Sequence, residues 1–256
     1  MAYIISVANQ KGGVGKTTTT VNLATYLAAN GRFVLLVDLD PQANATSGFG
    51  IDHRSLEKGL YDALSGAVSF KDIILPTSVD GLKIAPGTTA LAGAAVELVN
   101  VERREFRLAE ALLEIRNNFD YVIIDCPPSL GLLTINGLVA ADRLLIPVQA
   151  EYYALEGLSQ LLSTVDLVKA NLKPELEIMG AVITMFDSRN TLSNDVMNEL
   201  YKFFPNKIFR SAVPRNVRLA ESPSFGKPIM QYDPESKGAK AYERLALEIL
   251  DLEKSL

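Results

Sequence analysis

Short apolar runs recur along the chain, and half of them contain no polar residue. An apolar run without polar alternation is typical of a parallel strand that is buried on both faces. Several of these runs are also rich in β-branched residues, which favour strands. We predict strands at Ile4–Val7, Phe33–Val37, Leu82–Ala85, Tyr121–Ile124, Leu144–Val148 and Ile178–Met185.

Between these runs, apolar residues recur at the three- and four-residue spacing of amphipathic helices. We predict helices at Thr18–Asn30, Leu56–Leu64, Glu97–Asn118, Leu132–Ala140, Leu155–Ala170, Ser193–Phe203 and Ala239–Leu252. Strands that alternate with helices predict an α/β fold with a doubly wound, mostly parallel sheet and helices on both faces. We expect residues 1–256 to form a single domain without an N-terminal helix-turn-helix extension, because no low-complexity linker divides the chain.

The composition narrows the class of protein. Hydrophobic residues make up 48% and charged residues 21% of the chain, which is typical of a globular protein. The chain has a single cysteine, Cys126, which excludes an internal disulfide framework. It also has a single histidine, His53, and these two low counts argue against a zinc or iron–sulfur site within one chain. No apolar run reaches the ~18 residues of a membrane span, and no signal peptide is recognisable. We therefore expect a cytoplasmic protein.

A glycine-rich turn separates the first predicted strand from the first predicted helix. Glycines in this position let several backbone N–H groups point at one anion, and the helix dipole adds to the attraction. We expect a nucleotide's phosphates to be bound by Lys11, Gly12, Gly13, Val14, Gly15, Lys16, Thr17 and Thr18.

Two features set this loop apart from the usual phosphate-binding pattern. Lys16 is placed to reach the β- and γ-phosphates, and the Thr17 hydroxyl is placed to bind Mg²⁺. The usual pattern has a further glycine five residues before Gly15, where this chain has Gln10. A second lysine, Lys11, stands at the mouth of the loop instead. The sequence therefore predicts a nucleotide site of an unusual kind.

Three aspartates follow predicted strands. Asp38 and Asp40 come after one strand and Asp125 after another, so all three are expected at the sheet edge that carries the phosphate loop. Taken alone, an aspartate after a strand is more often a cap or turn residue. A phosphate loop in the same chain favours a role in binding Mg²⁺ through water. Asp40, whose turn is fixed by Pro41, is the better candidate for orienting an attacking water.

Several motifs, in this order, resemble those of one family. The segment KGGVGKT at 11–17 resembles the deviant Walker A motif, in which Lys11 is the signature lysine. Further similar segments are DLDPQ at 38–42, DCPPSLG at 125–131, EYYALEG at 151–157, VPRNVR at 213–218 and AESP at 220–223. The resemblance covers essentially the whole chain. It is to the ParA/Soj-type chromosome and plasmid partitioning ATPases of the deviant Walker A (ParA/MinD) family.

This resemblance implies a P-loop ATPase that uses ATP and Mg²⁺. It implies that Lys11 reaches across a homodimer interface to the partner's phosphates, in the manner of a residue acting in trans. Lys11, Lys16 and Asp40 would then be the catalytic residues, with Asp40 positioning water. Thr17 and, through water, Asp125 would serve Mg²⁺, and Asp40 is a further candidate through water. Pro214 and Asn216 resemble the residues that hold the adenine.

The resemblance also implies sequence-independent binding of double-stranded DNA through Arg189 and Arg218. The net charge of −5 gives no reason by itself to expect nucleic acid. However, the segment 202–240 contains eight basic residues and three acidic ones, so the charge is segregated along the chain. The family further implies a ParB-type partner that stimulates hydrolysis, and a protein associated with the nucleoid and not with a membrane.

Other classes of protein share the loop. The main alternative is a MinD-like membrane-associated positioning ATPase, which would end in a basic amphipathic helix. Here residues 247–256 are acidic instead. A nitrogenase-reductase-like electron carrier would need at least two cysteines per subunit. A small-molecule ligase of dethiobiotin-synthetase type would need a substrate pocket, and no motif indicates one.

Overall fold

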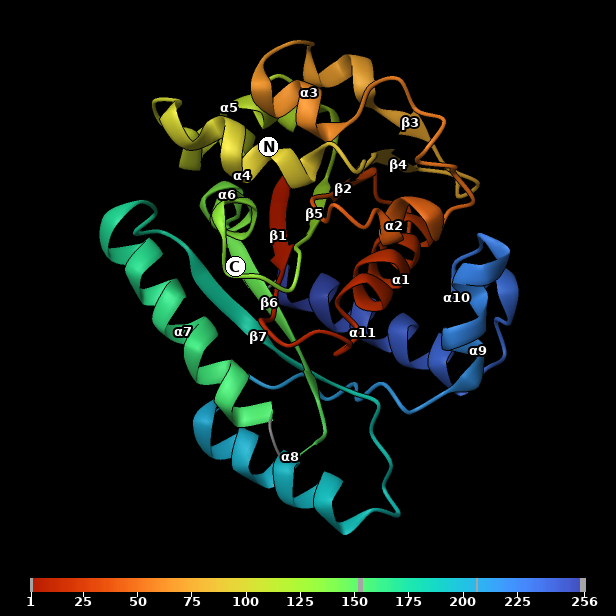
Figure 1. The fold of residues 1–256 in the computed structure, drawn as a ribbon. Coiled ribbons are helices and arrows are strands. Elements are labelled where there is room, and N and C mark those ends of the chain that lie inside the picture. The colour runs from red at the N-terminus through yellow and green to blue at the C-terminus, as the bar shows by residue number, and fades with distance from the viewer. Residues whose placement is uncertain (1, 152–153, 206, 254–256) are drawn as a thin grey trace.

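The structure is a computed structural model that describes residues 2–151, 154–205 and 207–253 (Figure 1). Within these ranges, strands form a seven-stranded sheet in the order β3-β4-β2-β5-β1-β6-β7. All neighbouring pairs are parallel except β3 with β4. The strands are β1 (Tyr3–Val7), β2 (Val34–Asp38), β3 (Leu75–Pro76), β4 (Leu82–Ala85), β5 (Tyr121–Asp125), β6 (Arg143–Gln149) and β7 (Glu177–Thr184). The six predicted strands are confirmed, and the two-residue β3 was not predicted.

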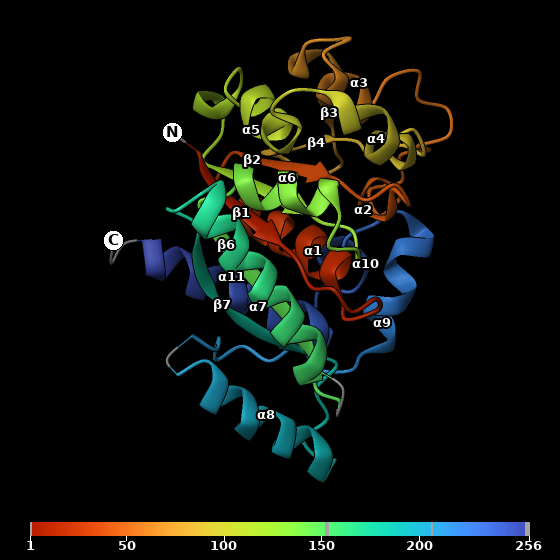
Figure 2. The ribbon, with the colours of Figure 1, turned by 60° about the vertical axis from the view of Figure 1, so that its left-hand side comes forward.

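Helices cover both faces of this sheet (Figures 1 and 2). They are α1 (Lys16–Ala29), α2 (Asn44–Ser47), α3 (Leu60–Ser65), α4 (Leu91–Glu97), α5 (Arg107–Leu112), α6 (Leu132–Ala140), α7 (Ala154–Asn171), α8 (Thr191–Phe203), α9 (Val217–Glu221), α10 (Ile229–Tyr232) and α11 (Lys237–Glu253). Short 3-10 helices are η1 (Phe70–Ile73), η2 (Leu98–Asn100), η3 (Arg104–Phe106), η4 (Arg116–Asn118) and η5 (Ser222–Phe225). No helix in the described part of the chain combines the length and apolar character of a membrane span.

The central strands are fully buried because their side chains point alternately into two apolar layers. Ile4, Leu35 and Val122 belong to the layer under α3 to α8. Ile5, Leu36 and Ile123 belong to the layer under α1, α10 and α11. The doubly wound, mostly parallel α/β fold is thus confirmed.

The prediction of one long helix over 97–118 is wrong. The chain there forms the end of α4, then η2, η3, α5 and η4 as separate short pieces. Arg103 has a left-handed backbone, with φ of 56°, which interrupts the helix. The Asn136 side chain, on α6, donates to the Arg104 carbonyl at 2.9 Å and accepts from the Leu108 amide at 3.1 Å. A tertiary contact therefore stabilises the break, although the apolar spacing suits a continuous helix.

The helix predicted over 56–64 begins later than expected, at Leu60. Gly59 is extended, and its amide donates to the Asp62 carboxylate at 2.8 Å, which caps the helix at this point. The short helices α2, α9 and α10 were not predicted, because four or five residues are too few to show a helical period.

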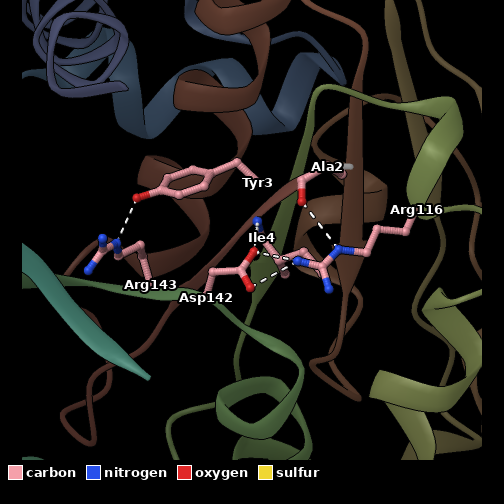
Figure 3. A network of polar contacts seen from close by, with 6 residues as sticks. All are labelled: Ala2, Tyr3, Ile4, Arg116, Asp142 and Arg143. Atoms are coloured by element: carbon pink, nitrogen blue, oxygen red, sulfur yellow. Dashed lines mark hydrogen bonds and ion pairs between the residues drawn. The ribbon is translucent and has the colours of Figure 1, made fainter. Parts of the chain in front are cut away.

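A polar network joins the amino-terminal ends of the central strands, at the sheet edge away from the phosphate loop (Figure 3). The Arg116 guanidinium donates to both carboxylate oxygens of Asp142, at 3.0 and 2.9 Å. Asp142 also accepts from the Ile4 amide at 2.9 Å. Beside it, Arg143 donates to the Tyr3 hydroxyl at 2.8 Å. The network ties β1 to the start of β6 and to η4.

Replacing Asp142 with alanine is expected to lower the free energy of unfolding by about 2 kcal/mol, because the Ile4 amide and Arg116 both lose their acceptor. Urea-induced unfolding measures this change. Glu199→Ala is the matched control, since it removes only an exposed pair with Lys202 and should cost less than about 0.5 kcal/mol. Equal stability of the two variants would contradict a structural role for the network.

Candidate nucleotide-binding and hydrolysis site

The carboxyl ends of β1, β5 and β2 lie side by side and bring the predicted site residues together. Val7 pairs with Asp125, and Asp125 pairs with Asp38. The loop after β1 turns into α1 through Gly13 and Gly15, whose φ angles are 75° and 86°. These left-handed conformations favour glycine, and they are the kind of turn in which successive backbone amides can face one anion. The predicted phosphate loop therefore has the required backbone.

Lys16 begins α1 and lies over this loop. Its side chain is 7% exposed, and its ammonium donates to the Lys11 carbonyl at 3.1 Å. Burial lowers the pKa of the Lys16 ammonium, while the negative charges of Asp125 and Asp40 act in the opposite direction. A phosphate bound here would restore the electrostatic stabilisation that burial removes from this cation.

Asp125 is fully buried at the end of β5 and accepts hydrogen bonds from two threonines of α1. The Thr17 hydroxyl donates to it at 2.7 Å and the Thr20 hydroxyl at 2.9 Å. Thr20 was not predicted as a site residue, although it lies three residues after Thr17 and so shares its face of the helix. Burial raises the pKa of the Asp125 carboxyl and the nearby Asp38 charge adds to this effect, whereas the threonine hydrogen bonds oppose it.

The oxygen atoms at this edge fit Mg²⁺. This ion prefers oxygen ligands and keeps several waters, so it needs few protein ligands when phosphates are present. Thr17 offers a hydroxyl, and Asp125 and Asp40 offer carboxylates at the carboxyl ends of β5 and β2. No group of three or more acidic, histidine or cysteine side chains suited to a metal occurs among the described residues, which is compatible with a magnesium–nucleotide site. A cation here would also favour the ionised form of Asp125.

Asp40 lies in the loop after β2 and is 7% exposed. Its Oδ1 accepts from the Gln42 amide at 2.9 Å, and its own amide donates to Asp38 at 3.3 Å. Asp38 is fully buried, and burial raises the pKa of its carboxyl, while hydrogen bonds from Thr46 oppose this. The two aspartates of this loop thus differ in environment, and the negative charge of Asp40 is near enough to Lys16 to act on the pKa of its ammonium.

Comparison with known proteins places the chain in a family. A model of the AAA domain family matches residues 2–178. The sporulation initiation inhibitor protein Soj of Bacillus subtilis is 55% identical over 97% of this chain and 98% of its own length. The chromosome partitioning protein ParA of Myxococcus xanthus is 53% identical over 96% of this chain and 87% of its own length.

The chain belongs to the ParA/Soj family of partitioning ATPases. Among solved structures, cobyrinic acid a,c-diamide synthase from Mycobacterium smegmatis with bound ADP and magnesium has a TM-score of 0.89. That protein is 38% identical, and the match covers 100% of this chain and 96% of the other. Membership of the ParA/Soj family makes the chain a P-loop ATPase, with ATP and Mg²⁺ as its substrate and cofactor.

Lys11, the signature lysine of this family's loop, extends its side chain to Glu151 in the loop after β6. Its ammonium lies 3.4 Å from Glu151 Oε2. Glu151 also accepts from the Gln149 side chain at 2.6 Å and lies 3.6 Å from the Arg215 guanidinium. The Glu151 carboxylate thus joins the phosphate loop to the segment that contains Pro214. Tyr152 and Tyr153 of the same motif lie outside the described residues.

Pro214 and Asn216 are not in the cavity beside the phosphate loop. Pro214 pairs with Phe186 just after β7, and Asn216 caps α9 by accepting from the Arg218 amide at 2.8 Å. The cavity, of about 440 Å³, opens at Thr17 and Thr18 and extends between α1, α2 and η5. The structure therefore leaves adenine binding by Pro214 and Asn216 as a prediction.

The two arginines predicted to bind DNA lie on neighbouring segments, and both are paired with carboxylates. Arg189 has a side chain that is 87% exposed and donates to both oxygens of Asp187, at 3.0 and 2.8 Å. Arg218 pairs with Glu221 at 2.9 Å and with Asp233 at 3.4 Å. Exposed pairs of this kind contribute little to stability, so exchanging the carboxylate for another anion would cost little free energy.

Proposed function

We propose that this chain is an ATP-dependent DNA-partitioning protein whose ATP-bound dimer binds DNA without reading its sequence. Hydrolysis, stimulated by a ParB-type partner, then releases the DNA and drives segregation of a chromosome or plasmid. The observation that carries the proposal is the presence of two lysines at one phosphate loop. Lys16 is buried over the loop, whereas Lys11 is partly exposed and pairs with Glu151.

Within one subunit, Lys16 and the loop from Gly12 to Thr18 would bind the phosphates, and Thr17 and Asp125 would hold Mg²⁺, the latter through water. The ion would neutralise charge on the phosphates and orient them. Asp40 would orient the attacking water by accepting its proton in a hydrogen bond. The loop amides and the Lys16 ammonium would stabilise the charge that develops on the phosphoryl oxygens.

Lys11 would complete the site of a second copy. Its pair with Glu151 is long and both side chains are partly exposed, so the pair is worth less than about 1 kcal/mol. The γ-phosphate of a partner's ATP offers a stronger acceptor in a site closed to water. Exchange of Glu151 for that phosphate would make dimer formation dependent on ATP.

DNA binding would depend on the basic segment 202–240 together with Arg189. A dimer would present two such surfaces, which explains why affinity for DNA would depend on ATP. The carboxyl-terminal helix supports this proposal over membrane attachment, because the apolar residues Leu245, Ile249 and Leu250 of α11 are buried against the sheet. They are therefore not available to insert into a bilayer.

Arg218→Ala and Arg189→Ala are each expected to weaken DNA binding by about 1 kcal/mol or more and to reduce the salt slope of log K by about 1. ATP-dependent dimerisation should remain. Lys83→Ala on β4 is the matched control, since it removes the same charge outside the 202–240 segment. Fluorescence anisotropy with duplex DNA over a salt series measures both quantities. Wild-type affinity that hardly changes with salt would contradict binding through phosphates.

One experiment tests the function as a whole. Retention on DNA is measured with ATP, with ADP and without nucleotide, and retention with ATP alone is expected. Retention in none of the three conditions would contradict the proposal. The name of the Mycobacterium smegmatis structure raises a second candidate, a small-molecule amide-forming ligase. Such an enzyme would hydrolyse ATP only with an acid and an amine donor present, whereas the partitioning ATPase turns over ATP with DNA and its protein partner.

A further inference from the structure

Thr46, in α2, connects two loops at the carboxyl edge of the sheet. Its amide and its hydroxyl both donate to Asp38 Oδ2, at 2.8 and 2.7 Å. The same hydroxyl accepts from the amide of Gly87, which follows β4, at 3.0 Å. Thr46 and Asp38 are both fully buried. One hydroxyl therefore joins the end of β2, the start of α2 and the segment after β4.

The loop held in this way is the one that contains Asp40. It leaves the sheet at Asp38 and returns to the same carboxylate at Thr46, so Asp40 lies inside a closed turn. Ala43, also in this turn, has φ of 51°, a left-handed conformation that costs a non-glycine residue about 1 kcal/mol or more. Other contacts must offset this cost, and the Thr46 hydroxyl makes two of them, one to Asp38 within the turn and one from Gly87 outside it.

Gly87 packs so closely against the turn that the position has no room for a side chain. A Cβ atom at this position would lie 2.9 Å from the Asp38 carbonyl oxygen and 3.0 Å from that of Asp40. Both atoms belong to the backbone and cannot move away without shifting the turn. The segment after β4 is thus pressed against the backbone of Asp40 itself, and the bond from Gly87 to Thr46 holds it there.

We propose that Thr46 is a positioning residue for ATP hydrolysis, which sets the place of the Asp40 carboxylate relative to the phosphate loop. Thr46 does not touch the reacting atoms and acts through Asp38, Gly87 and the backbone of the turn. The inference rests on the proposed role of Asp40. It predicts that loss of the hydroxyl affects the rate of hydrolysis and leaves nucleotide binding unchanged, because the contacts of Lys16 and Thr17 lie on α1.

A comparison of Thr46→Val with Thr46→Ser separates the effect of losing the hydroxyl from the effect of changing the shape of the side chain. Valine keeps the volume but removes the donor and the acceptor, and we expect kcat to fall about tenfold to a hundredfold with KM for ATP nearly unchanged. Serine keeps the hydroxyl and should restore most of the wild-type kcat. Steady-state ATP hydrolysis measures kcat and KM separately, and thermal unfolding checks that each variant is folded. A normal kcat in Thr46→Val would overturn the inference.

Gly87→Ala makes the test independent of the folding of Thr46→Val, and a double variant tests the pathway through Asp40. Gly87→Ala should lower kcat in the same selective way, because its Cβ displaces the turn from the other side; an unchanged kcat in a folded Gly87→Ala protein would count against the inference. Thr46→Val combined with Asp40→Ala should be no slower than Asp40→Ala alone, since both act through one carboxylate. An additive loss would overturn the pathway through Asp40. Normal turnover in Asp40→Ala would instead overturn the role proposed for Asp40, so the two failures are distinguishable.

Discussion

Lys16→Ala is expected to weaken ATP binding by at least about thirtyfold, the largest loss of ATP affinity among the substitutions considered. The Lys16 ammonium is buried over the phosphate loop and donates to a backbone carbonyl, that of Lys11. Truncating one partner of a desolvated charge pair costs about 2–5 kcal/mol, which corresponds to this loss of affinity or more. Isothermal titration calorimetry with ATP and Mg²⁺ measures the dissociation constant directly.

Lys11→Ala provides the matched control, because it removes the same charge from the same loop. Lys11 is directed toward Glu151 and not over the phosphate site, so this variant should bind ATP as a monomer with nearly normal affinity. It should fail to dimerise with ATP, which analytical ultracentrifugation would detect. Tight ATP retention by Lys16→Ala would contradict the site assignment, and normal dimerisation of Lys11→Ala would contradict the role in trans.

Asp40→Ala should slow hydrolysis by about 10²-fold or more and leave ATP binding intact, because it removes the group proposed to orient the water. The Thr17–Asp125 contact does not involve Asp40, so the metal side of the site should persist. The variant should therefore dimerise on ATP and stay on DNA. Single-turnover hydrolysis and the lifetime of the DNA complex measure the two effects.

The matched control for Asp40 is Asp52→Ala. Asp52 makes the same kind of turn, since its Oδ1 accepts from the amide two residues on, at 3.1 Å, but it lies on an exposed turn. Its loss should leave hydrolysis unchanged. If Asp40→Ala turned over ATP at the normal rate, the water-orienting role would have to pass to another residue.

Much of the fold follows from contiguous residues. The apolar runs of β1, β2 and β5 predict central parallel strands, because a strand that is covered on both faces needs apolar side chains on both faces. The phosphate loop is equally local, since its glycines, lysines and threonines are consecutive. The segment 97–118 is the contrary case, because its apolar spacing suits one helix while Asn136, from a distant part of the chain, caps the start of another.

By itself, the sequence determined the six longer strands, the phosphate loop and the end of the sheet where the aspartates gather. These depend on neighbouring residues and on the rule that parallel strands end at one edge. Only the tertiary structure decided that Lys11 pairs with Glu151, that Thr20 joins Thr17 on Asp125, and that Gly87 closes against the turn of Asp40. The physical reason is that each of these contacts joins residues from different elements. The distances between these residues depend on how the sheet and the helices pack, so a pattern of neighbouring residues cannot predict them.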